Sequence, residues 1–175
     1  TATREQASRW IPKIVAGEVI LSVGITEPNM GSDMKSLRTR AVRDGDRYVI
    51  NGAKTFMTHG KQADVCLLAA RTSNDGAKGI SLFLIETKKT PGFNVSKFLD
   101  KIGQNGLDTC EVFLDNVEVP AENLIGSVEG RGFGQLIDVF IKERLSIAVF
   151  AVASAERAVE MTVEHAKNRQ MFGQR

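Results

Sequence analysis

The strongest constraint on the fold is an unbroken helical pattern near the end of the chain. From Phe133 to about Asn168 the sequence contains no proline, and its only glycine is Gly134. Apolar residues recur there at steps of three and four, which predicts an α-helix on the order of 50 Å long. Between Leu145 and Ala153 this helix is apolar on nearly every side, so we expect it to need partner elements on several faces.

The two ends of the chain indicate that this helix belongs to a larger helical assembly. The sequence stops at Arg175 without supplying the partners, so we expect helical material after Arg175 and before Thr1. Residues 1–18 are typical of the last part of a helix, ended by Pro12 and Gly17.

The middle of the chain, from about Val19 to Pro120, has the pattern of a β domain. Short β-branched and aromatic runs alternate with turn signals, and the helical period vanishes. Asp44-Gly45 and Asn51-Gly52 favour two-residue hairpins, so we expect an antiparallel meander of seven or eight strands. The predicted class is α+β, an antiparallel β-barrel or sandwich followed by the long helix. The runs are VILSVGIT, LRTRAV, RYVI, AKTFMTH, VCLLAAR, ISLFLIE, FNVSKFL and CEVFLDNVEV.

Charge and hydropathy exclude several classes of function. Lys and Arg total 23 against 21 Asp and Glu, a net charge of +2 that is too small for sequence-independent binding of nucleic acid. Discrete anion sites for a phosphorylated small molecule remain open. No run reaches the ~18 apolar residues of a membrane span. The first ten residues, TATREQASRW, lack the apolar region of a secretory signal, so we expect a soluble, intracellular protein.

The cysteines and histidines predict no metal centre. Cys66 and Cys110 both lie in apolar runs and form no CxxC pair, which indicates small buried side chains in a reducing compartment. His59 and His165 are far apart in the sequence, so no zinc-ligand spacing exists.

Six segments, in order along the chain, carry a family resemblance. ITEPNMGSD at 25–33 resembles the Thr-Glu-Pro-x-x-Gly-Ser-Asp signature of the acyl-CoA dehydrogenases. DGDRYVINGAKTFMTHG at 44–60 resembles the strand pair of that family with an NGxK-aromatic-x-Thr-Asn-Gly motif. The other matching segments are GISLFLIETKKTPGF (79–93), KIGQNGLDTCEVFLDNVEVPAENLIG (101–126), GRGFGQLIDVFIKERLSIA (130–148) and AKNRQMFGQR (166–175).

The resemblance implies a division into three parts. Residues 1–18 correspond to the end of an N-terminal helical domain, and residues 19–126 to a middle β-barrel domain. Residues 127–175 correspond to the start of a C-terminal four-helix domain, here truncated. On this interpretation the isolated segment is inactive and binds cofactor weakly or not at all.

The resemblance places a flavin and a substrate along residues 23–33. Thr26 and the neighbouring backbone, including Val23 and Ile25, are expected to lie against the flavin of FAD, whose ring heteroatoms need fixed hydrogen-bond donors. Ser32 is expected to contact the pantetheine or adenosine part of CoA. The structural alternative for Thr26 is a turn hydroxyl that satisfies the local backbone.

A second cofactor-facing group is predicted at residues 56–58. By resemblance, Phe56 covers a face of the flavin, and the hydroxyl of Thr58 reaches the N5 edge, with Met57 between them. Phe56 stands where the family more often has tryptophan, so the aromatic face is kept and the indole N–H is lost. His59 replaces the usual asparagine and is given no role.

The glycine-rich segment at 130–134 is not predicted to bind a dinucleotide. It imitates a dinucleotide loop, but it follows a loop rather than a buried parallel strand, and residue 135 is Gln, so GxGxxG fails. We expect a flexible lead into the long helix.

Glu143 is the candidate catalytic base. On a helix it shares an apolar face with Val139 and Ile147, where desolvation favours the protonated form and suits a carboxylate to general-base work. The structural alternative is a buried ion pair. By resemblance, the base of long-chain and isovaleryl enzymes lies at Glu143, whereas most others carry it further on, beyond Arg175. Arg144 is the family's helix arginine and a candidate substrate contact.

The last segment is predicted to reach a neighbouring subunit. Arg169, with Met171 and Phe172, matches the family's Arg-x-x-Phe-Gly, whose arginine binds the FAD pyrophosphate across a dimer contact. The alternative is a solvated cation favoured by the dipole at a helix end.

Together these features imply an FAD-dependent α,β-dehydrogenation of a fatty acyl-CoA to a trans-2-enoyl-CoA. A carboxylate removes the α-proton, and hydride goes to flavin N5. The implied partners are an electron-transferring flavoprotein and further copies of the chain, in a homodimer or homotetramer, in a bacterial cytoplasm or the mitochondrial matrix. The alternatives are an acyl-CoA oxidase or flavin monooxygenase on the same fold, or a non-catalytic β-sandwich binding module.

Overall fold

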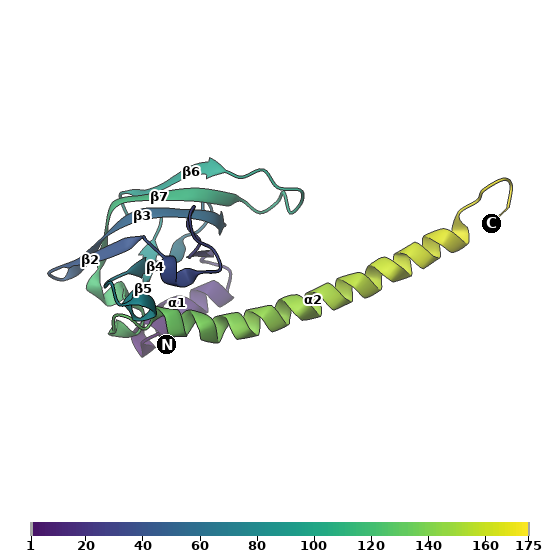
Figure 1. Ribbon diagram of the computed structural model, residues 1–175. Helices are drawn as coiled ribbons and strands as arrows, with labels where there is room; N and C mark the ends of the chain where they lie inside the picture. Colours follow the sequence, from purple (N-terminus) through teal and green to yellow (C-terminus); the bar gives the residue numbers. More distant parts are fainter. Residues whose placement is uncertain (1, 175) are drawn as a thin grey trace. The chain divides into compact units, whose positions relative to one another are not determined.

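The computed structural model describes residues 2–174, which form two compact units divided after Gln135. The first unit contains the strands and the short helix α1, and the second contains most of the long helix α2 (Figure 1). This arrangement confirms the predicted α+β class. The elements are α1 (Arg4–Val15), β1 (Leu21–Gly24), β2 (Arg40–Asp44), β3 (Arg47–Thr58), β4 (Val65–Arg71), β5 (Ile80–Glu86), β6 (Phe93–Phe98), β7 (Thr109–Pro120) and α2 (Gly132–Asn168).

The strands form one curled sheet. β3 pairs antiparallel with both β2 and β7, β6 pairs with β7, and β5 pairs with β4. β1, however, runs parallel to β4, with Leu21 opposite Val65 and Gly24 opposite Leu68, and β2 meets β4 in parallel at Arg40. The predicted antiparallel meander is therefore wrong in one respect, because β4 accepts β1 and β2 along one side while its hairpin partner β5 takes the other.

Of the two predicted hairpin dipeptides, only one makes a turn. β2 and β3 are joined through Gly45, whose φ of +62° suits the two-residue connection. Asn51-Gly52 lies inside β3, where the pairing with β7 shifts register. A Cβ at Gly52 would lie 2.5 Å from Thr39 Oγ1, so this glycine serves a close approach of two backbones rather than a hairpin.

The core of the first unit lies on the inner side of the curled sheet. Tyr48 and Phe83 meet edge to face with ring centroids 4.9 Å apart, and both are buried. Cys66 and Cys110 are free, buried thiols, as predicted. Burial raises the pKa of Cys66 to about 12, which keeps this thiol protonated and unreactive.

α1 ends near Gly17 as predicted, but it does not break at Pro12. Its first turn is closed by a capping box between Thr3 and Gln6, and Pro12 lies within the helix rather than ending it. The helix ends one turn later near Gly17, whose φ is +74°. Gln6 Nε2 donates to the carbonyl oxygens of Glu122 and Leu124, each at 2.8 Å, and so ties α1 to the segment that follows β7.

The lead into α2 is held tightly, contrary to the flexible segment predicted. A Cβ at Gly130 would lie 2.2 Å from the carbonyl oxygen of Lys78, and one at Gly132 would lie 2.9 Å from that of Ile80. The N–H of Gly130 also donates to Ser81 Oγ at 2.9 Å. These glycines allow the chain to pass directly over the start of β5.

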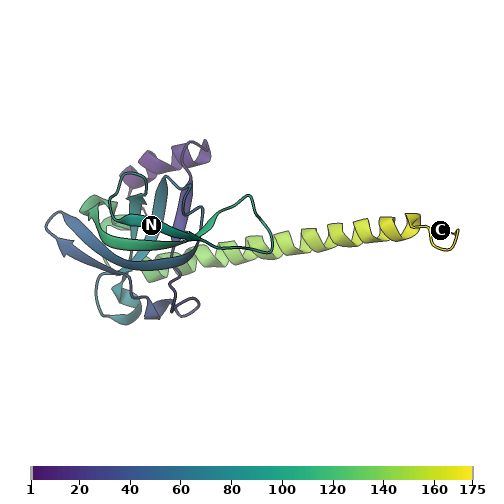
Figure 2. The same ribbon diagram turned by 90° about the horizontal axis from the view of Figure 1, so that it is seen from above.

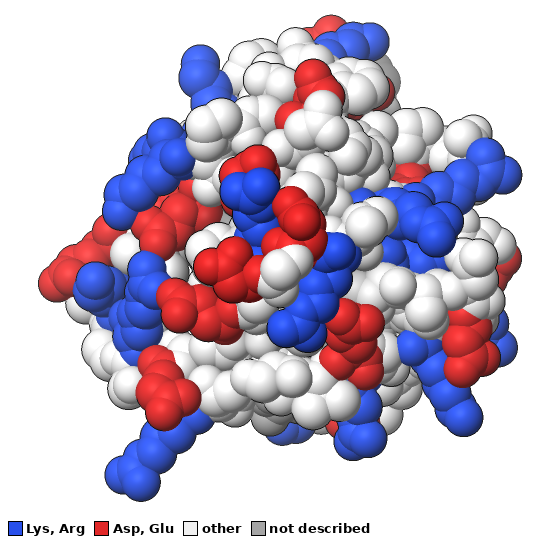
Figure 3. Space-filling view, turned by 90° about the vertical axis from the view of Figure 1, so that its left-hand side faces the viewer, with Lys and Arg blue, Asp and Glu red and all other residues white. Residues whose placement is uncertain are grey.

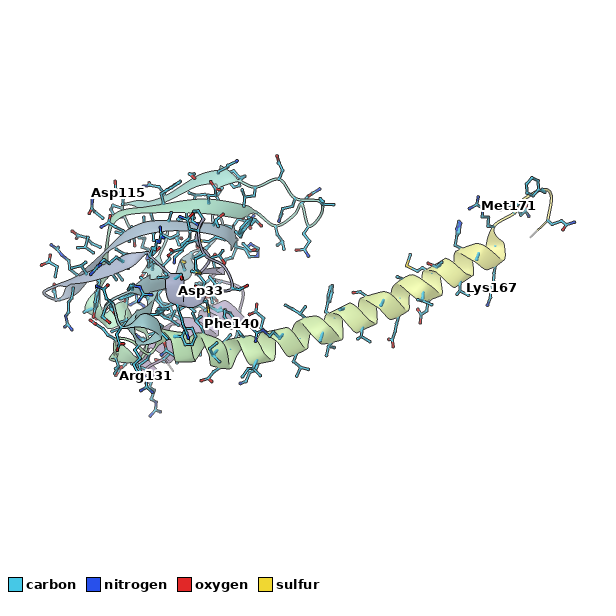
Figure 4. The ribbon with its side chains drawn as sticks, viewed as in Figure 1. Asp33, Asp115, Arg131, Phe140, Lys167 and Met171 are labelled. Atoms are coloured by element: carbon cyan, nitrogen blue, oxygen red, sulfur yellow. The ribbon has the colours of Figure 1, made fainter. Side chains whose placement is uncertain are left out.

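α2 is a single continuous helix whose side chains project on every side (Figure 4). Every side chain from residue 141 to residue 174 is exposed, including Leu145 at 67% and Phe150 at 71%. The predicted helix is confirmed, and its apolar faces are uncovered within the described chain. No helix in residues 2–174 has both the length and the apolar character of a membrane span.

The surface of the first unit has a projecting loop and charges of mixed sign (Figure 2 and Figure 3). The β6–β7 connection, residues 99–108, projects from the sheet as a long loop (Figure 2). On the face in Figure 3, Lys and Arg lie among Asp and Glu, and neither sign of charge dominates.

Within the described residues no three His, Cys, Asp or Glu side chains cluster as metal ligands.

Candidate functional site

The two segments predicted to face a flavin lie side by side. The Thr55 N–H donates to the Thr26 carbonyl oxygen at 2.9 Å, and Ser22 Oγ donates to the Thr58 carbonyl oxygen at 2.7 Å. We call Val23–Thr26 together with Phe56–Thr58 the shelf. The shelf joins the end of β1 to the end of β3. Ser22 and Thr58, which are hydrogen-bonded there, are 36 residues apart in the sequence.

Most side chains of the shelf are accessible. Val23 is 44% exposed and Phe56 is 66% exposed, Thr58 is exposed, and Ile25 and Thr26 are half-buried. These residues can therefore meet a ligand directly.

Met57 differs from the rest of the shelf. Its side chain is only 1% exposed and belongs to the core cluster of the sheet. Any contact of Met57 with a cofactor at this surface therefore involves its backbone rather than its thioether.

Phe56 is held in an unusual backbone conformation. Its φ is +56°, in the left-handed region that bulky side chains rarely adopt, and the β3–β7 register shifts between Lys54 and Met57. Because Thr55 and Met57 on either side are buried, this irregularity turns the phenyl ring outward while the strand continues into the core. Strained backbone of this kind persists only where its surroundings hold it.

Sequence reasoning missed a buried ion pair next to the shelf. Lys54 Nζ lies 2.9 Å from Glu27 Oε1, and the two side chains are 0% and 6% exposed. Glu27 also accepts the N–H groups of Arg38 at 2.8 Å and Thr39 at 2.9 Å. A signal was present, because strict alternation along β3 places Lys54 on the same inward face as Tyr48.

Burial and pairing act in opposite directions on the two charges. Burial lowers the pKa of Lys54 to about 8, although the negative charge of Glu27 opposes that shift. Burial by itself raises the pKa of Glu27, but the ammonium of Lys54 and the hydrogen bonds from Thr39 outweigh it and hold that pKa below its usual value. The carboxylate is therefore strongly held in its charged form.

A turn connects the shelf to the predicted CoA contact. Glu27 and Met30 exchange backbone hydrogen bonds of 2.9 and 3.0 Å around Pro28, whose fixed φ suits this position. Ser32 follows in an exposed stretch, and the hydroxyl of Ser36 donates to Asp33 close by. Ser32 lies outside the shelf, and its contact with CoA stays a prediction.

A small polar cluster follows the shelf at the end of β3. The N–H of His59 donates to the carbonyl oxygen of Asp108 at 2.9 Å, and Asp108 Oδ2 accepts the Lys61 N–H at 3.0 Å. Burial raises the pKa of Asp108, but the hydrogen bonds that its carboxylate accepts from the Lys61 N–H and the Cys110 thiol outweigh it, and the pKa is lowered overall. His59 Nδ1 and Asp108 Oδ1 are buried without hydrogen-bond partners in the described chain.

The remaining predicted residues belong to the helical unit. Glu143 and Arg144 are consecutive on α2, and both side chains are exposed. Residues 2–174 therefore do not bury the Glu143 carboxylate, although the sequence predicts its desolvation. Arg169 follows the end of α2, and Met171 begins a turn beyond it (Figure 4). Phe172 is 99% exposed with φ of +52°.

Two family models match most of the chain. The acyl-CoA dehydrogenase middle domain matches residues 22–117, and the acyl-CoA dehydrogenase C-terminal domain matches residues 130–175. The mitochondrial long-chain specific acyl-CoA dehydrogenase of Sus scrofa is 40% identical over 174 residues, which cover 98% of this chain and 40% of that protein.

Solved structures share the fold. An acyl-CoA dehydrogenase from Geobacillus kaustophilus is 42% identical with a TM-score of 0.93, over 99% of this chain and 46% of that one. A prolyl acyl carrier protein oxidase is 38% identical with a TM-score of 0.91, over 98% and 45%. This chain spans less than half the length of the curated relatives it matches. The two domain matches and these relatives show that the chain belongs to the acyl-CoA dehydrogenase family.

Proposed function

We propose that this chain forms the flavin-facing part of an FAD-dependent enzyme that dehydrogenates a fatty acyl-CoA thioester to a trans-2-enoyl-CoA. The observation that carries the proposal is the shelf, where β1 and β3 bring Thr26 and Phe56–Thr58 together in a member of this family. On this proposal residues 1–18 end an N-terminal helical domain, 19–126 form the middle domain, and 127–175 begin the C-terminal domain of a longer protein.

The residues of the shelf fit an isoalloxazine ring. Phe56 offers an exposed aromatic face, Thr26 and Thr58 offer hydroxyl groups, and the backbone that carries them is fixed by hydrogen bonds to buried strands. Val23 and Ile25 add an apolar border. When bound, FAD supplies an acceptor for the β-hydrogen, which leaves as hydride.

We assign the removal of the substrate α-proton to Glu143. Its carboxylate removes the pro-R proton, and Arg144 binds substrate beside it. The family resemblance implies that long-chain enzymes carry their base at this helix position, and a long-chain enzyme of Sus scrofa is among the similar proteins. The alternative base is a glutamate beyond Arg175.

The residues after α2 are proposed to contact a neighbouring subunit. We propose that Arg169, with Met171 and Phe172, contacts the pyrophosphate of FAD held by a neighbouring subunit in a homodimer or homotetramer. Electrons then pass to an electron-transferring flavoprotein. The related enzymes include mitochondrial and bacterial proteins, and we propose a bacterial cytoplasm or the mitochondrial matrix as the location.

An oxidase is the second candidate, because one similar structure is a prolyl acyl carrier protein oxidase. Oxidases and dehydrogenases share the reductive half of the reaction and differ in whether oxygen reoxidises the cofactor.

The whole protein that contains this segment tests both candidates. It should purify yellow, and acyl-CoA added without air should bleach the flavin absorbance. Air should then restore the colour only slowly, whereas an electron-transferring flavoprotein restores it rapidly. Rapid reoxidation in air with one equivalent of peroxide supports the oxidase, and a colourless protein rejects both.

A further inference from the structure

Two buried charges lie against the shelf and take no part in the proposed chemistry. Lys54 and Glu27 form the most deeply buried ion pair in the described chain, and the others that the structure describes have side chains exposed by 22% or more. The partners come from different motifs, since Glu27 precedes Pro28 after β1 whereas Lys54 lies within β3. Their contact therefore joins the two halves of the shelf.

Lys54 reaches the shelf directly. Its Nζ donates to the Ile25 carbonyl oxygen at 3.1 Å as well as to Glu27. Ile25 precedes Thr26, and Lys54 lies two residues before Phe56. The ammonium thus binds the backbone carbonyl group that directly precedes Thr26, and its own residue directly precedes Thr55, which donates to Thr26.

We propose that Lys54 and Glu27 are positioning residues that hold Thr26 and Phe56 in the arrangement that a bound flavin contacts. This inference rests on the proposed function of the shelf. Glu27 orients the ammonium and is itself fixed by the N–H groups of Arg38 and Thr39. Lys54 transmits that constraint to the Ile25 carbonyl group.

Stability alone does not explain the charges. A buried ion pair is often no more stabilising than apolar side chains of similar volume, because desolvation offsets the attraction between the charges. An ammonium group, however, donates along several directions at once, and Lys54 uses two of them to orient a carboxylate and a carbonyl group. The left-handed backbone at Phe56 needs such support, since its conformation is unfavourable by itself.

The test separates positioning from folding by using two variants of the whole flavoprotein. Lys54→Met leaves the Glu27 carboxylate buried without its partner and is expected to lower the melting temperature strongly. Glu27→Gln/Lys54→Met removes both charges and keeps an amide oxygen that can accept from the Thr39 N–H. Lys88→Met is the matched control, because its exposed Nζ pairs with Asp64 at 2.7 Å on the surface.

We expect the double variant to recover most of the melting temperature that Lys54→Met loses. Its kcat should still fall about 100-fold with little change in KM, the scale expected for misplaced reacting groups. The visible circular dichroism of its bound flavin should also change, whereas Lys88→Met should match the wild type in each measurement.

Three outcomes would overturn the inference. A double variant with wild-type kcat and flavin dichroism would make the pair dispensable for positioning. A double variant that melts as low as Lys54→Met would make the pair an element of stability. A wild-type protein without flavin would reject the proposed function itself, and this inference with it.

Discussion

The sheet unit buries its large apolar side chains, whereas the helical unit leaves most of its apolar side chains exposed. In the first, Phe83 and Ile50 are fully buried, and even a lysine lies in the interior because a carboxylate meets it there. In the second, Leu145 and Phe150 are 67% and 71% exposed. An α-helix satisfies its backbone hydrogen bonds within itself, so it can form while its apolar faces stay uncovered, whereas strands pair only with other strands. The comparison teaches that the first unit encloses its own hydrophobic core, whereas the second unit forms a regular helix without one.

The largest effect is expected at Glu143, the residue of the helical unit that we propose as the catalytic base. In the whole protein, Glu143→Gln should lower kcat by about 10²–10⁴-fold, because the amide cannot accept the α-proton, while the flavin stays bound. Steady-state turnover together with the flavin absorbance measures both properties. Near-normal turnover would instead assign the base to a glutamate beyond Arg175.

A matched pair of phenylalanines tests the difference in burial. In this chain, Phe83→Ala should lower the free energy of unfolding by about 3–5 kcal/mol, because it opens a cavity beside Tyr48. Phe150→Ala should change it by less than about 0.5 kcal/mol, because the side chain is exposed. Urea titration followed by circular dichroism gives both values. Equal losses in the two variants would contradict the division between the units.

Two glycines at the junction sharpen the comparison on a smaller scale. Gly130→Ala should cost about 1–3 kcal/mol, because its φ is +75° and its Cβ would strike the carbonyl oxygen of Lys78. Gly134→Ala should be neutral or stabilise by up to about 1 kcal/mol, since open space surrounds that Cβ inside a helix. Thermal melting of both variants measures the contrast, and a harmless Gly130→Ala would restore the flexible lead predicted from sequence.

The smallest effect is a pH dependence that belongs to the sheet unit alone. Burial, and then the hydrogen bond that Tyr48 donates to Glu129, raise the pKa of Tyr48 to about 12. Because the folded-state pKa lies above the unfolded value of about 10, this contribution to stability is present below pH 10 and is lost between about pH 10 and pH 12. Tyr48→Phe should remove that part of the pH dependence when urea midpoints are compared at about pH 9 and pH 11. An unchanged dependence would argue against the Tyr48–Glu129 contact.

Local signals in the sequence predicted several features correctly. Gly45 marks a real hairpin, the α2 pattern marks a real helix, and the apolar runs around Cys66 and Cys110 place both thiols in the core. Each of these depends on neighbours in the chain, through backbone conformation or periodicity. Six motifs in family order also identified the family, because such an order is specific even when single motifs are not.

Features that depend on distant neighbours were missed. Asn51-Gly52 has the composition of a hairpin, yet Thr39 from another part of the chain makes it a close crossing within β3. Glu27 and Lys54 are charged residues of types that are rarely buried unpaired. Alternation along β3 places Lys54 inward, but only the contact with Glu27 allows both charges to be buried.

The sequence by itself determined where helix and strand occur, which family the chain belongs to, and which residues are candidates for the site. Only the tertiary structure decided that β1 runs parallel to β4, that Phe56 adopts a left-handed backbone, and that Lys54 reaches the Ile25 carbonyl group. The physical reason is the sequence separation over which each interaction acts. Periodicity and turn preferences act over a few residues, whereas strand order and the pairing of buried charges depend on groups that only folding brings into contact.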